Sequence, residues 1–404
     1  MSRSKIAADS YSPLYFLASV GSGGLAVTFF MYLLFWVPHP GRPVPIFEDI
    51  MSAFSTGGPA LQAAIVVAMA GIAFFAVLNF KSLIWNLGAL SRFAKTDAYT
   101  KLRGTNGETT LLAAPLAAAM SINVGFIVGL VFVPQLWTVV EYLFPLAMIA
   151  FVLVGIWAFR LIGAFLGRVL SEGGAFDVTA HNSFAQLLPA FALSMTGVGL
   201  AAPAAMSGQT IVVGTALVLS TFFGIAALLY ATIAALTAFS SMLMYGTARE
   251  SGPTLMIIVP LMTVLGILFM RQDHGLHVVF EAHTEAAQTM VFLARLLTVQ
   301  IVFLLLGMLV LGRQKYFDDF VLGSKTSPGS YALVCPGVAL SVMVQFFVNK
   351  GLVASQVIDK FSPAYWALTA VALIAQWMMV ALVLRLNRQH FRPQVVKTAA
   401  IPAE

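Results

Sequence analysis

The chain has 404 residues, of which 60% are hydrophobic and only 9% are charged, and its mean hydropathy is +0.91. Since a soluble domain carries about 25% charged residues, this composition excludes an ordinary soluble protein and indicates one embedded in the lipid bilayer. The net charge of +6 does not indicate a nucleic-acid partner, because the basic residues gather at the ends of apolar segments. The single cysteine, Cys335, excludes a disulfide framework and a multi-cysteine metal site.

Apolar segments long enough to cross a bilayer, which takes about 20 residues in a helix, recur along the whole chain. They do not alternate with period two, so they predict ten helices and no barrel. The expected spans are 13–38, 59–91, 110–133, 136–168, 183–206, 209–244, 252–271, 287–312, 328–348 and 364–386. We expect residues 1–12 to form a cytoplasmic N-terminus without a signal peptide, residues 13–386 the transmembrane domain, and residues 387–404 a cytoplasmic tail.

The orientation follows from the basic residues. With a cytoplasmic N-terminus, fifteen of them lie on the inside: Arg3, Lys5, Arg92, Lys95, Lys101, Arg103, Arg168, Arg249, Arg313, Lys315, Lys325, Arg385, Arg388, Arg392 and Lys397. Four lie on the outside: Arg42, Arg271, Lys350 and Lys360. This excess predicts that both termini are cytoplasmic.

Prolines recur at nearly equal intervals in the odd-numbered segments. Pro115, Pro189, Pro260 and Pro336 are separated by 74, 71 and 76 residues, and they open the similar stretches "PLAAAMS", "PAFALSM", "PLMTVLG" and "PGVALSV". The first segment has "GSGG" at a similar depth. The period predicts a helical hairpin that is repeated five times.

A proline inside a membrane helix frees a carbonyl and kinks the helix, which is tolerated where hydroxyls or water satisfy the freed group. The odd segments carry small polar side chains, so we expect an all-α bundle with kinked odd helices around a central pore and even helices facing lipid. The alternative is that these residues only permit close helix packing. The expected pore-lining residues are Ser22, Gly23, Pro115, Ser121, Asn123, Pro189, Ser194, Thr196, Pro260, Thr263, Pro336 and Ser341.

The expected pore contains no ring of acidic residues. Cation pathways are commonly lined by Asp or Glu rings, and proton pumps by relay carboxylates. A weakly polar lining in a basic protein therefore favours anions or neutral solutes.

With these features the chain resembles the tellurite-resistance and C4-dicarboxylate transporters, a family that includes the plant slow anion channel. The resemblance covers essentially the whole chain, and "ASVGSGGLAVTFF" and "SGPTLMIIVP" are its local matches. It implies a channel or transporter for small anions, among them dicarboxylates, that assembles as a homotrimer. We expect no cofactor and a bacterial inner-membrane location.

The ninth segment departs from this family at Cys335, within "SYALVCPGVAL". The family has two tryptophans and then Phe-Pro at this place, and the phenylalanine plugs the pore. A bacterial group known as TsoY, which the chain also resembles, has cysteine or selenocysteine before the proline, which implies sulfur or selenium chemistry. Cys335 would then lie at the constriction of the anion pore.

Two other roles for Cys335 stay open. It is the expected nucleophile if the protein is a membrane thiol oxidoreductase or sulfur-transfer protein, which would need a soluble sulfur-carrier or thiol partner because no resolving cysteine exists. A free cysteine is also often a small buried packing residue, in a scaffold or receptor as well as in a pore.

The stretch "RQDHGLHVVFEAHTEAAQ" contains His274, His277 and His283 in an expected loop. Histidine and carboxylate side chains can bind zinc or copper, but no standard metal spacing is present, so a polar turn or short amphipathic helix is the alternative. Arg295 is the one cation expected well inside a span, paired with Glu141 or Glu285 or facing the anion path. Three phenylalanines near the odd-helix prolines are candidate replacements for the missing plug: Phe191, Phe346 and Phe347.

Overall fold

A computed structural model describes residues 6–173, 176–180, 183–280 and 284–391, and these residues form helices and connections without a β-strand. Ten spans are long and apolar enough to cross a membrane. The prediction of an all-α, multi-pass membrane protein with ten crossings is therefore confirmed.

Each odd-numbered span begins with a 3₁₀ segment and continues as an α-helix. These pairs are Pro13–Tyr15 with α1 (Phe16–Trp36), Asn106–Leu112 with α5 (Ala113–Phe132), Phe184–Leu187 with α7 (Leu188–Leu200), Gly252–Met256 with α10 (Ile258–Phe280) and Pro328–Leu333 with α12 (Val334–Phe346).

The repeated prolines lie at this change of helix type and do not kink a continuous α-helix. Pro189 is the second residue of α7, and Pro115, Pro260 and Pro336 are each the third residue of their α-helices. The first N–H groups of an α-helix have no partner within it, so the N–H that proline lacks is not missed there.

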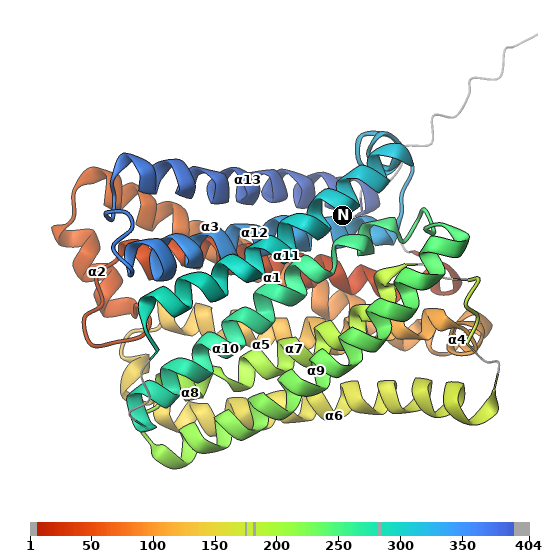
Figure 1. Ribbon diagram of the computed structural model, residues 1–404, viewed down its shortest axis with the longest axis horizontal. Helices are drawn as coiled ribbons and strands as arrows, with labels where there is room; N and C mark the ends of the chain where they lie inside the picture. The colour runs from red at the N-terminus through yellow and green to blue at the C-terminus, as the bar shows by residue number, and fades with distance from the viewer. Residues whose placement is uncertain (1–5, 174–175, 181–182, 281–283, 392–404) are drawn as a thin grey trace, which may run out of the picture.

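The even-numbered spans are uninterrupted α-helices: α3 (Pro59–Phe93), α6 (Val140–Glu172), α9 (Thr210–Tyr245), α11 (Ala286–Arg313) and α13 (Pro363–Phe391). Three short helices lie in connections: α2 (Phe47–Thr56), α4 (Asp97–Arg103) and α8 (Ala202–Met206). We call the end of the bundle where the odd spans begin the amino end, and the opposite end the carboxyl end. Figure 1 shows α2 and α8 at the carboxyl end and α4 at the amino end.

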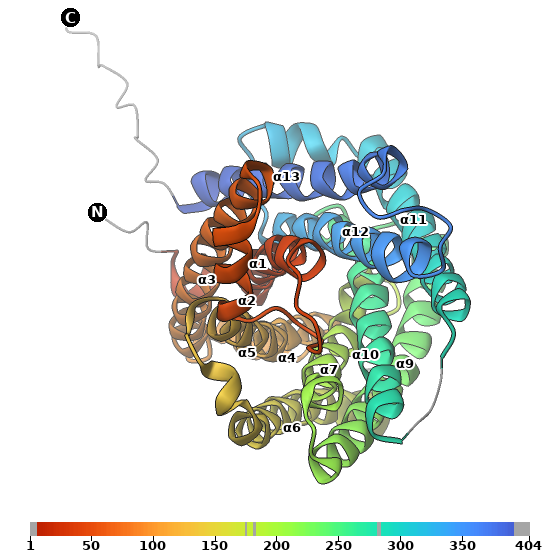
Figure 2. The ribbon, with the colours of Figure 1, turned by 90° about the vertical axis from the view of Figure 1, so that its left-hand side faces the viewer.

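The spans form two concentric rings, as the view from the carboxyl end shows (Figure 2). Helices α1, α5, α7, α10 and α12 pack in this order into a closed inner ring, and each outer helix packs against two neighbours of that ring. The odd spans are 67–94% buried in their most apolar stretches, whereas the even spans are only 22–39% buried there. The expected arrangement of inner odd and outer even helices is therefore present.

Three departures from plain spans shape the centre of the carboxyl end. Helix α10 continues to Phe280, nine residues beyond the expected end at residue 271 (280 − 271 = 9). The fifth span is broken at Ala201 between α7 and α8, and the ninth continues beyond α12 as a π-helix, Phe347–Val353. Interrupted helices and π-turns are frequent at functional sites in membrane proteins.

Candidate functional site

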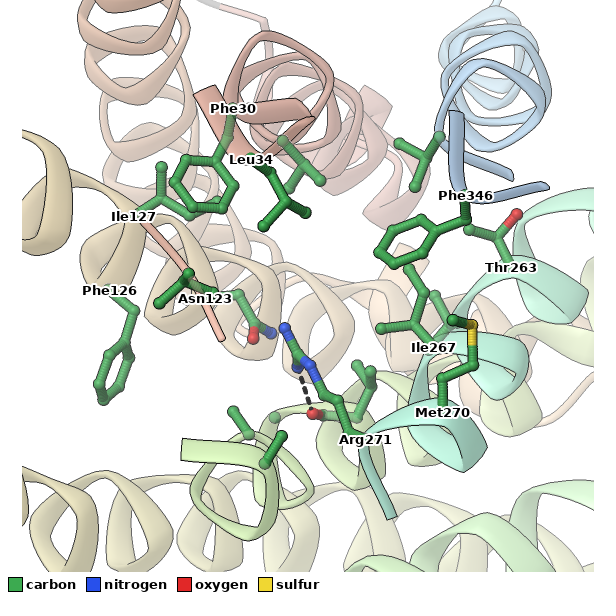
Figure 3. A pocket seen from close by; sticks show the side chains of 18 of the residues that line it. Phe30, Leu34, Asn123, Phe126, Ile127, Thr263, Ile267, Met270, Arg271 and Phe346 are labelled. Atoms are coloured by element: carbon green, nitrogen blue, oxygen red, sulfur yellow. Dashed lines mark hydrogen bonds between the residues drawn. The ribbon is translucent and has the colours of Figure 1, made fainter. Parts of the chain in front are cut away.

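The inner ring encloses a cavity of about 550 Å³ that is lined by residues from all five of its helices. The lining reaches Pro43 and Val44 in the connection after α1, and Ala354 after the π-helix, so the cavity extends to the carboxyl end. Most of the side chains drawn in Figure 3 are apolar. The cavity is therefore a largely apolar vestibule on the axis of the bundle.

The cavity narrows to a floor where the helices change from 3₁₀ to α winding. Phe191, Pro260 and Cys335 line both the cavity and a second pocket of about 10 Å³ on its amino side. The other residues around that pocket are mainly apolar: Leu17, Leu188, Pro253, Thr254, Ile257 and Ala332. Its volume is at the lower limit for one water molecule, so no hydrated anion fits there, and in this sense the amino side of the floor is sealed.

The spacing of the lining residues follows the winding of each helix. Below the floor, Thr254 of the 3₁₀ segment, Ile257 at its end and Pro260 in the first turn of α10 line the small pocket at three-residue intervals, which matches the three residues per turn with which the span begins. Above the floor the intervals are those of an α-helix, because Ile267 and Arg271 follow Pro260 at seven and eleven residues. One continuous stripe of each inner span can thus face the axis on both sides of the proline.

Arg271 projects from α10 into the middle of the cavity (Figure 3). Its guanidinium donates a hydrogen bond of 2.6 Å to the carbonyl of Val198. This carbonyl belongs to the last turn of α7, where the break at Ala201 leaves acceptors free and where the helix dipole favours a cation. None of the salt bridges among the described residues involves Arg271.

Asn123 of α5 points toward Arg271 from the facing wall (Figure 3). Its amide nitrogen donates to the Ala119 carbonyl at 3.0 Å and lies 3.8 Å from the Met195 sulfur. Both hydrogens of the amide nitrogen thus have acceptors, but a thioether sulfur accepts only weakly, so a bound group can replace Met195 as the partner. The hydroxyl of Thr263, by contrast, is engaged, because it donates to Ala339 and accepts from Gln300.

The mouth of the cavity is lined by Asp273, His274 and His277 of α10 and by Lys350 of the π-helix. The two histidines were expected in a loop, and the structure places both on the extended helix; His283 lies outside the described residues. Burial and the nearby positive charge of Lys350 lower the pKa of Lys360. Asp273 places a negative charge in the same mouth. The described residues contain no group of three His, Cys, Asp or Glu side chains that could hold a metal ion.

Four of the expected pore-lining residues, counting Cys335, line the cavity: Asn123, Pro260, Thr263 and Cys335. The others lie outside its lining: Ser22, Gly23, Pro115, Ser121, Pro189, Ser194, Thr196, Pro336 and Ser341. Four hydroxyls among them, those of Ser22, Ser121, Ser194 and Thr196, donate to carbonyls of their own helices, as Ser22 does to Ala18 at 2.7 Å and Thr196 to Ala192 at 3.0 Å. On α1 the cavity is lined by Gly21 and Gly24 on either side of the expected pair.

Arg295 lies on the exposed side of α11, and the described residues contain no salt bridge between it and Glu141 or Glu285. Glu141 instead accepts hydrogen bonds from Ser207 and Gly208. Of the candidate plug residues, Phe191 and Phe346 line the cavity, Phe191 at the floor, whereas Phe347 does not.

The sequence interpretation missed Arg271 because it ended the seventh span at this residue. The signal was the apolar stretch "GLHVVF" at residues 275–280, which continues the helix and carries Arg271 inward. The cavity thus offers one central cation and one amide donor among apolar walls, which is a setting for an anion.

In comparisons with known proteins, no family model and no curated protein matches the chain.

Proposed function

We propose that the protein is a channel or transporter that carries an anion across a membrane through the central cavity. The observation that carries this proposal is Arg271, a half-buried guanidinium on the axis of an apolar cavity to which no carboxylate of the described residues is bonded. A charge removed from water without a counter-charge is costly, so a bound anion stabilises the site and a cation does not.

The proposal includes membership of the tellurite-resistance and C4-dicarboxylate transporter family and of the TsoY group. It also includes a trimeric assembly, a bacterial inner membrane with both termini in the cytoplasm, and a sulfur- or selenium-containing anion as substrate. The ring of proline-marked inner helices supports the family, and the arginine supports the charge of the substrate.

The surroundings of Cys335 favour transport over thiol chemistry. The side chain is only 7% exposed, and its neighbours around the floor are apolar residues and Thr254. A reactive thiolate needs a nearby cation or strong hydrogen-bond donor, and none of those residues carries a charge. The thiol oxidoreductase alternative therefore has no supporting feature in the described site.

The test is anion flux through Arg271→Gln protein. Proteoliposomes loaded with potassium chloride or potassium ethanesulfonate are treated with valinomycin, so that potassium efflux reports the permeation of the anion. A hydrogen bond to a charged group contributes about 1.5–3 kcal/mol, so the variant should lose about tenfold or more of the flux.

Arg295→Gln is the matched control, because Arg271 lies nine residues before the last residue of α10, Phe280, and Arg295 lies nine residues after the first residue of α11, Ala286, so both lie at a similar distance from the carboxyl end of the bundle. It removes the same charge from the outer surface and should conduct like the parent protein. Equal flux through all three proteins, or a permeability to potassium without valinomycin, would overturn the proposal.

A further inference from the structure

We infer that the bound anion is monovalent and carries an apolar body, an inference that rests on the proposed function and names its substrate class. The geometry that points to it is one guanidinium in the centre of a cavity whose remaining walls are mostly hydrocarbon. A ligand with one charged head and an apolar remainder matches both parts of that surface.

The charge count favours a monoanion. At the level of Arg271 the labelled side chains of Figure 3 include no other cation, and Asn123 and Thr263 are the polar ones among them. The second anionic group of a dianion would lie against apolar walls without a partner, which is costly. Lys350 at the mouth shares the lining with Asp273, whose charge is opposite, so these two residues add no net positive charge for a second anionic group.

The walls favour an apolar body over a hydrated inorganic ion. Phe30, Leu34, Ile127, Ile267 and Phe346 surround the space beside Arg271 (Figure 3). These side chains cannot replace the water that an inorganic anion gives up on entering. An alkyl chain is stabilised by the same contacts, at about fourfold in affinity per buried methylene.

The size of the cavity agrees with an organic ligand. Its volume of about 550 Å³ lies within the range of about 300–1,000 Å³ that is typical of pockets for organic molecules. A site for a bare halide would enclose the ion much more closely.

Arg271 has a structural role as well, since it caps α7 through the Val198 carbonyl. That bond engages one N–H group of a guanidinium that has five, so capping and ligand binding are compatible. The experiment must therefore measure how binding depends on the structure of the ligand as well as on the presence of Arg271.

The probes are alkanesulfonates, which stay ionised at all working pH values. Binding of radiolabelled ethane-, butane- and hexanesulfonate to the full-length protein in lipid nanodiscs is measured by equilibrium dialysis, and binding to empty nanodiscs is subtracted. Hexanesulfonate should bind about sixteenfold more tightly than butanesulfonate, because it adds two methylenes. Butane-1,4-disulfonate and sulfate should bind more weakly than butanesulfonate.

Two variants locate the effect in the cavity. Arg271→Gln should weaken the three monosulfonates by a similar factor of about ten or more, whereas Arg295→Gln should not change them. Ile267→Thr replaces an apolar side chain of the wall with a smaller one that carries a hydroxyl, and it should reduce the preference for hexanesulfonate over butanesulfonate.

The outcomes separate this inference from the proposed function. Binding that depends on Arg271 and yet has equal affinity for all chain lengths, or that favours sulfate or the disulfonate, overturns the inference that the ligand has an apolar body. Neither result affects the proposed anion pathway. Binding that does not depend on Arg271 overturns both. No binding of any sulfonate overturns this inference, and the chloride flux then decides the proposed function.

Discussion

Cys335 is the residue whose setting the structure defines most sharply. Together with Phe191 and Pro260 it forms the boundary between the open cavity and the sealed amino side. The sequence predicted a constriction at this place from the position of Cys335 before a periodic proline. The sequence could not predict that Phe191 forms the other half of this boundary. Phe191 is one of 32 phenylalanines, and only the packing of α7 against the axis distinguishes it.

The first prediction concerns the access of reagents to this thiol. Because Cys335 is the only cysteine, labelling of the protein in vesicles with 2-sulfonatoethyl methanethiosulfonate reports on this site alone. The cavity leads to Cys335 from the carboxyl end while the amino side is sealed, so labelling should be several times faster from the carboxyl end. Mass spectrometry of the intact protein measures the rate.

Cys335→Ala protein provides the blank in this experiment. Equal labelling rates from the two sides would show that the floor is not a barrier. Complete protection of Cys335 from labelling on both sides would show that it does not line the cavity.

At the scale of elements, glycines on α1 bring it close to α12. A Cβ atom on Gly21 would lie 2.8 Å from Val334, and one on Gly24 would lie 2.7 Å from Val338. Both valines are β-branched and stiff at χ1, so they cannot rotate away at low cost. The stretch "GSGG" therefore acts through contact between helices as well as through the lining of the cavity.

We predict that Gly24→Ala destabilises the protein by about 1–3 kcal/mol, as overpacking of a tight interface generally does. The midpoint of thermal unfolding in detergent measures the effect. Gly163→Ala on the outer helix α6 is the matched control, because no atom lies within 4 Å of the added Cβ. A similar unfolding temperature for the two variants would contradict the close approach of α1 and α12.

The helices also show which features of the fold could be predicted from the sequence. Hydropathy alone predicted the ten spans, since a bilayer requires about 20 apolar residues whatever their packing. The periodic prolines separated inner from outer helices. The side chains that face the axis were harder to predict, because the candidates were chosen as prolines and small or polar residues, whereas the lining of the cavity is mostly apolar. Ser22 and Gly23 are not part of that lining, although their neighbours Gly21 and Gly24 are.

At the scale of the whole molecule, the excess of basic residues at the amino end has a testable consequence. The positive-inside rule predicts that this end faces the cytoplasm and that the cavity opens to the opposite side. Green fluorescent protein fused after residue 404 should then fluoresce in bacterial cells, whereas alkaline phosphatase at the same site should be inactive. Active phosphatase with a dark fluorescent fusion would reverse the orientation, and with it the side from which the cavity is filled.

The sealed floor also determines where a membrane voltage acts. Solution in the cavity holds its walls near the electrical potential of the carboxyl side, so most of the voltage falls across the thin apolar barrier below Phe191 and Cys335. An anion bound at Arg271 has therefore crossed little of the field, and its next step crosses most of it, at about 2.3 kcal/mol per elementary charge for every 100 mV. In such a bundle the voltage governs passage through the floor far more than occupancy of the site.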